Sequence, residues 1–177
     1  ALTDAAAPLL VSVTIEDTGT ADGLIDKLTM TWSENVDTDD SAPPVLADFG
    51  TITLPDGQAV SSATISDPAG AASTVVLTSV VGQVPPNTAV GSTAVNGITT
   101  QWTDGTNATS NPDDAESIVD SAKPFLRTDG SNAAKYQDVN TNGTIDAVRL
   151  VFSENITITY SDANWTATAN DLTSFDV

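Results

Sequence analysis

One nine-residue segment of the chain has the residue types and spacing of a calcium-binding loop. Its oxygen-bearing side chains alternate, and a glycine stands at the sixth place; the residues concerned are Asp138, Asn140, Asn142, Gly143, Thr144 and Asp146. Alternate side chains of such a loop converge on one point, the glycine permits a sharp turn, and a backbone carbonyl, here that of Thr144, adds a ligand. The segment therefore predicts a Ca²⁺ site built from oxygen ligands.

The same segment also fits a hairpin that needs no metal. Asn142-Gly143 is a strong signal for a two-residue hairpin turn, and Asp and Asn form local turns unaided. The twelfth place holds Arg149, where an EF-hand has a bidentate glutamate, and a strand is expected to follow instead of a helix. The sequence excludes an EF-hand and leaves both other interpretations open.

An earlier segment forms a second candidate loop. Asp17, Asp22 and Asp26 could bind a cation by charge, but the spacing from Asp17 to Gly23 is one residue longer than in the later loop. A hairpin with an Asp-Gly turn is the favoured interpretation of this segment, and Ca²⁺ is the alternative.

The composition excludes several classes of protein. The 177 residues include 24 Asp and Glu, 5 Lys and Arg, no Cys and no His, for a net charge of -19. Disulfides, His- or Cys-ligated metal sites and a Ser-His-Asp triad are therefore impossible. We expect no nucleic-acid partner, because phosphate binding needs cations, and no membrane insertion, because the apolar stretches are too short.

An internal repeat organises the chain. Residues 23–36 read GLIDKLTMTWSENV and residues 143–156 read GTIDAVRLVFSENI, and a shorter match links residues 7–10 with residues 123–126. Apolar residues alternate within both copies, which predicts a strand with one buried face. We therefore expect one unit at residues 1–120 and a partial second unit at residues 121–177, which is truncated, degenerate or completed by a neighbouring chain. Glu34 and Glu154 are then repeat-equivalent residues and not a catalytic pair, so we expect no enzyme.

The remaining patterns predict an all-β fold. Alternating or continuous apolar runs bounded by turn residues predict strands near residues 11–15, 25–32, 49–54, 59–65, 74–81, 90–91 and 98–102. Turns are expected at residues 55–57 and 104–105, and a helical turn near residues 112–116. The length of the first unit fits an immunoglobulin-like β-sandwich.

The strand motif carries a resemblance to a known family. Residues 32–36 (WSENV) and 152–156 (FSENI) resemble the F-S-E-x-V stretch of tandem bacterial and archaeal Ig-like surface modules, and so does the D-x-N-x-N-G-x-I-D run before the second copy. Such modules occur in S-layer proteins, adhesins and surface filaments. The resemblance covers about the first third of each unit. It implies an Ig-like sandwich with a structural or interaction role, located outside the cell or on its surface.

Together these observations predict an extracellular structural or adhesive module of a surface layer, filament or adhesin, rigidified by Ca²⁺ in its acidic loops. The expected partners are further copies or other surface proteins, with strand addition as one route, and glycans are a further class. The alternative is a carbohydrate-binding module in which Trp102, Tyr160 and Trp165 stack on sugars.

Overall fold

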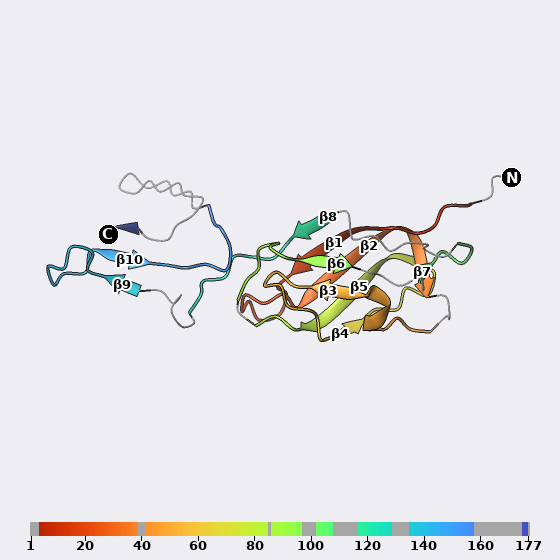
Figure 1. The fold of residues 1–177 in the computed structure, drawn as a ribbon, viewed down its shortest axis with the longest axis horizontal. Helices are drawn as coiled ribbons and strands as arrows, with labels where there is room; N and C mark the ends of the chain where they lie inside the picture. Colours follow the sequence, from red (N-terminus) through yellow and green to blue (C-terminus); the bar gives the residue numbers. More distant parts are fainter. Residues whose placement is uncertain are drawn as a thin grey trace.

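The computed structural model describes residues 4–38, 42–84, 86–96, 102–107, 117–128, 135–157 and 175–176. The regular elements of these residues are strands, apart from the short 3₁₀ helix η1 (Leu46–Phe49). The all-β prediction is confirmed at this level. Strands β1 to β8 form a larger unit, and β9 to β11 form a smaller one at one end of an elongated molecule (Figure 1). No helix in the described part of the chain is long and apolar enough to cross a membrane.

The larger sheet is centred on β2 (Lys27–Thr38), which pairs antiparallel with β1 (Leu10–Glu16) and β5 (Ala72–Val81). Its strand order is β4-β5-β2-β1-β8, and β7 pairs with the far end of β2. The bounds of the outer strands are Ser62–Ile65 for β4, Trp102–Thr103 for β7 and Ser117–Asp120 for β8. Because β8 runs parallel to β1, the sheet is mixed.

A smaller antiparallel sheet contains β3 (Thr51–Thr53) and β6 (Ala94–Asn96). Apolar side chains from both sheets share one core, whose fully buried members include Val13, Ile15, Leu28, Met30, Val75 and Leu77 from the larger sheet and Phe49, Ile52, Leu54 and Val95 from the second layer. Trp102 joins them, with its ring 4.9 Å from that of Trp32 and 5.1 Å from that of Phe49. Each buried side chain of this size stabilises the fold by about 1.5–3 kcal/mol, so this core dominates the stability of the first unit.

Three details differ from the predicted strand pattern. Val11 was expected to point inward with its neighbours but is exposed, because a β-bulge lies between Leu10 and Ser12. Phe49 ends η1 instead of starting a strand. The strand expected at residues 90–91 is a turn, and β6 begins four residues later. Within the predicted strand 98–102, residues 98–101 lie outside the described residues, as does the predicted helical turn at residues 112–116.

The smaller unit contains one described sheet, in the order β11-β10-β9. Its strands are β9 (Lys135–Gln137), β10 (Ala147–Arg149) and β11 (Phe175–Asp176). β10 pairs antiparallel with both neighbours, as β2 does with β1 and β5. The register also corresponds, because Val148 lies opposite Phe175 as Leu28 lies opposite Leu77. The three strands thus reproduce the centre of the larger sheet.

Candidate functional site

The first acidic loop joins β1 to β2 and is closed by carboxylates. Asp26 accepts hydrogen bonds from the backbone of Thr18 at 2.9 Å and of Gly19 at 2.9 Å. Asp17 accepts one from the backbone of Gly23 at 2.9 Å, and Asp22 accepts one from the backbone of Leu24. Gly23 has a φ of 80°, a conformation that glycine adopts without strain. The three predicted ligands therefore shape the turn themselves.

The second loop, between β9 and β10, repeats this arrangement. Asp146 accepts a hydrogen bond from the backbone of Val139 at 2.8 Å, and Asp138 accepts one from the backbone of Gly143 at 2.6 Å. Gly143 has a φ of 84°. The amide oxygen of Asn140 accepts from the backbone of Asn142, whose own amide oxygen accepts from the backbone of Thr144. β9 and β10 do form an antiparallel hairpin, but the predicted two-residue Asn142-Gly143 turn is wrong, because residues 138–146 lie between the strands and Asn142 lacks the positive φ that such a turn requires. The loop is closed by its own side-chain oxygens, and each of them keeps a second lone pair that a cation could use.

One atom in the first loop fits a bound cation. Asp17 Oδ1 is buried and has no hydrogen-bond partner among the described residues. Burial raises the pKa of Asp17, and the negative charges of Asp22 and Asp26 raise it further. An oxygen that is out of contact with water and lacks a donor is costly, and a hard cation would satisfy it. The donor set of both loops, carboxylate and amide oxygens, suits Ca²⁺.

The structure also gathers three carboxylates that the sequence analysis did not select. Within the described residues, Asp4, Glu34 and Asp104 place one oxygen each within 4.8 Å of the others. Burial raises the pKa of Glu34, and the charges of Asp104 and Asp4 add to this effect. Backbone donors at Asn107 and Thr106 hold the pKa of Asp104 below its ordinary value. The members come from the N-terminal segment, β2 and the turn after β7, so no local pattern could have identified the cluster.

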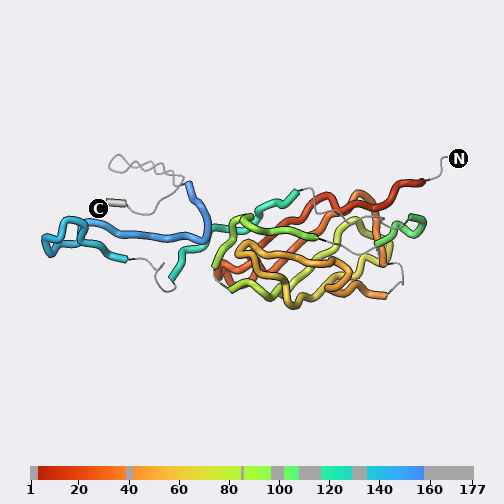
Figure 2. The backbone as a smooth tube through the Cα atoms, in the orientation of Figure 1, coloured from red at the N-terminus to blue at the C-terminus, as the bar shows by residue number. Residues whose placement is uncertain are grey.

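A second contact that no sequence pattern signals joins the two units. A Cβ atom added at Gly23 would lie 2.7 Å from Phe125 Cδ1, so this ring covers the first acidic loop directly. Thr88 is fully buried, and its hydroxyl donates to Glu154 Oε1 at 2.6 Å and lies 2.7 Å from Ser153 Oγ. Hydrogen bonds and a close apolar contact therefore connect one end of the first unit to the second unit. Figure 2 shows the two units meeting at this point.

Glu154 in this joint has an altered pKa. Burial raises it most, and the neighbouring Asp120 raises it further through its charge and a hydrogen bond, while the bond from Thr88 opposes the rise. Asp120 and Glu154 correspond by repeat spacing to Asp4 and Glu34, so the carboxyl pair occurs twice: once within the first unit, and once between β8 of the first unit and the second unit.

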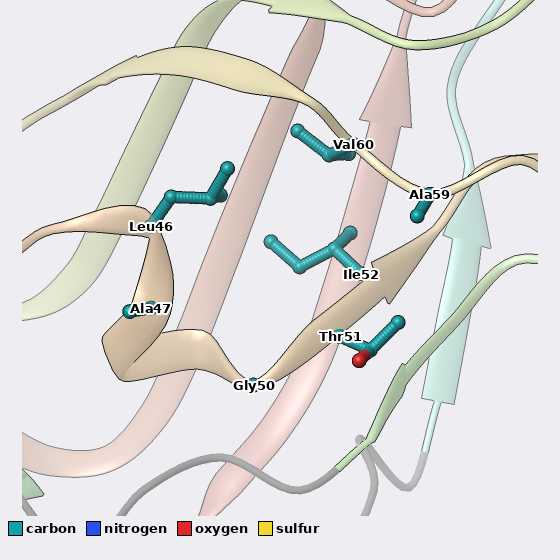
Figure 3. A pocket seen from close by; sticks show the side chains of 7 residues that line it. All are labelled: Leu46, Ala47, Gly50, Thr51, Ile52, Ala59 and Val60. Carbon is teal, nitrogen blue, oxygen red and sulfur yellow. The ribbon is translucent and has the colours of Figure 1, made fainter.

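The aromatic residues give little support to sugar stacking. Trp102 is fully buried, and its indole donates to the carbonyl of Asp48 at 3.1 Å. Tyr160 and Trp165 lie outside the described residues. A pocket of about 270 Å³ lies beside β3. In Figure 3, Leu46, Ile52 and Val60 point toward one another in it, and none of its seven lining residues is titratable. The pocket therefore offers no acid, base or charged nucleophile.

No protein-family model, curated protein or solved structure matches this chain.

Proposed function

We propose that the chain is an extracellular structural spacer in a surface layer, filament or adhesin. Its consecutive Ig-like β units are joined rigidly end to end, so that the distance the chain spans is fixed. The joint between the two units is the observation that best supports this proposal. Phe125 covers Gly23, and the buried Thr88 hydroxyl bonds Ser153 and Glu154. A flexible linker would leave such groups in water, whereas a packed joint restricts the angle between the units.

The strand order supports the Ig-like part of the proposal. One Ig sheet contains strands A, B, E and D, and the other contains C, F and G. Here β4-β5-β2-β1 has the order D-E-B-A, and β3 pairs with β6 as C pairs with F. The last strand, β8, differs, because it lies parallel to β1 in the larger sheet.

Calcium is the second part of the proposal. The first loop supports it through the unpartnered Asp17 Oδ1, and the second loop supports it through its ligand spacing. A cation bound only by the folded state stabilises that state by mass action and offsets repulsion in a chain of net charge -19. The residues that would hold it are Asp17, Asp22 and Asp26 in the first loop and Asp138, Asn140, Asn142, Thr144 and Asp146 in the second.

Small-angle X-ray scattering tests the spacer role. The wild-type chain should fit a single elongated particle. The Phe125→Ala variant, which uncovers Gly23, should require an ensemble of inter-unit angles. Tyr136→Ala is the matched control, since it removes an aromatic ring of the same unit that is 77% exposed, and its scattering should equal the wild type. A wild-type profile that already requires an ensemble would contradict the proposal.

A further inference from the structure

The surface with which the second unit contacts the first has a counterpart elsewhere in the molecule. Phe125 and Ser153 exchange two hydrogen bonds, both of 2.8 Å. Leu9 and Ser33 exchange the same two, at 3.0 and 2.9 Å. The next residues also correspond, because Leu10 pairs with Trp32 and Leu126 with Phe152. We call Leu9, Ser33 and Glu34 the free plug, and Phe125, Ser153 and Glu154 the engaged plug.

The two plugs differ in what covers them. Phe125 is partly buried against Gly23 of the first unit. Leu9 is 55% exposed. Leu9 is therefore held by the same two hydrogen bonds as the docked Phe125, but no described residue covers it as Gly23 covers Phe125.

The glycine loop of the receiving surface also occurs twice, without a described counterpart of Thr88 in the second copy. Gly23 is buried beneath Phe125, whereas a Cβ atom placed at Gly143 would meet no atom of the described residues within 4 Å. Both glycines have a left-handed backbone, and in both loops an aspartate accepts the glycine N–H. Beside the open glycine, Ile145 is 56% exposed, while its repeat equivalent Ile25 is buried. We call the loop around Gly143 the open socket.

The free plug and the open socket lie at opposite ends of the molecule. The N-terminal segment leads to one extreme of the trace, and the loop between β9 and β10 lies at the other (Figure 1). A contact between two different surfaces at opposite ends is heterologous, and when its rotation does not close, it continues as a filament.

We propose that copies of this chain associate head to tail, with Leu9 of one copy packed on the Gly143 loop of the next as Phe125 packs on Gly23. This inference rests on the proposed structural role and names its partner as a second copy. Both ends are acidic, so association requires salt that screens the charge; the Debye length is about 3 Å at 1 M salt.

Disulfide trapping tests this contact, because the chain contains no cysteine of its own. Leu9→Cys and Thr144→Cys proteins are mixed at high salt and mildly oxidised. The control pair is Leu9→Cys with Thr74→Cys, which lies at an exposed position of β5. The yield of disulfide-linked mixed dimer should be about tenfold higher for the first pair than for the control pair, because only the first pair is held close together. Equal yields for the two pairs, or a dominant dimer of Leu9→Cys with itself, would overturn the proposal.

A second variant keeps the test independent of the cysteines. Gly143→Asn adds a side chain on the docking face at a φ that Asn tolerates, and it should weaken association in sedimentation velocity about tenfold. Gly57→Asn is the matched control: its φ is 86°, and the nearest atom to an added Cβ lies at 3.9 Å. A wild-type chain that stays monomeric at millimolar concentration in 1 M salt would also overturn the inference. A rigid scattering particle without association refutes the filament contact alone, whereas a flexible joint refutes the spacer role itself.

Discussion

Equivalent strands of the two units carry similar apolar patterns but differ in burial. The loop bonds align Glu16 with Gln137, since each carbonyl accepts the backbone N–H of the aspartate that ends its loop, Asp26 or Asp146. Ile15 therefore corresponds to Tyr136. Ile15 is fully buried, whereas Tyr136 is 77% exposed.

The cause of this difference lies outside the strands themselves. In the first unit, β3 and β6 supply Ile52 and Val95 to the core that covers Ile15. The described part of the second unit contains one sheet, β9 to β11, and no covering layer. Alternation of apolar residues therefore specifies a strand and its inner face, but burial of that face is determined by a layer from elsewhere in the chain.

Truncation at the two equivalent positions should give the largest contrast. Ile15→Ala removes a fully buried side chain and should lower the free energy of unfolding by about 2–5 kcal/mol. Tyr136→Ala removes an exposed one and should change it by no more than about 0.5 kcal/mol. Urea denaturation followed by tryptophan fluorescence measures both. Comparable losses would show that the inner face of the second sheet is covered in solution.

The sequence predicted local features of the fold and missed those that depend on tertiary contacts. β2 was predicted from its alternating apolar residues, and β5 from a continuous apolar run that suggested a fully buried strand. Only one face of β5 is buried, and Val81 is 55% exposed. The exposure of Val11 was missed, because the bulge depends on the register of β1 against β2. Both acidic loops were identified from Asp and Gly spacing. Thr88 carried no signal, since its role arises only when the second unit meets it.

Calcium removal should have a smaller effect on stability, and variants of the two loops should show how much each loop contributes to it. At free Ca²⁺ ten times the dissociation constant, mass action adds about 1.4 kcal/mol per site, so EDTA should lower the melting temperature. Asp22→Asn in the first loop and Asp146→Asn in the second should each remove part of this shift, and the double variant should remove it all. Each substitution keeps the oxygen that accepts a backbone N–H in the native loop.

Calorimetry with and without Ca²⁺ measures the shift, and sodium chloride of equal ionic strength is the control. An equal rise in sodium chloride would assign the acidic residues to general charge screening. A melting curve that EDTA leaves unchanged would exclude calcium from both loops. Loss of the whole shift in one single variant would place the ion in that loop alone.

The smallest expected effect concerns the repeated carboxyl pair. Burial and Asp120 raise the pKa of Glu154 in the folded state, so the folded protein binds more protons than the unfolded one above the ordinary glutamate pKa. The stabilisation is then complete below that ordinary value and is lost as pH rises through the raised one. Asp120 is the titratable group that faces Glu154, and the hydroxyls of Thr88 and Ser153 do not titrate in this range.

Glu154→Gln keeps an acceptor for the Thr88 hydroxyl and removes the charge opposite Asp120. The variant should therefore be more stable than the wild type at neutral pH, by a few tenths of a kcal/mol because solvent screens a partly exposed group, and its stability should fall less as pH rises. Glu34→Gln is the matched substitution at the first unit, where no described residue plays the part of Thr88. Both should flatten the pH dependence of the melting temperature, but only Glu154→Gln should alter inter-unit scattering, since only that glutamate lies in a joint. Equal effects of the two variants on scattering would mean that the carboxyl pair acts within each unit and not between them.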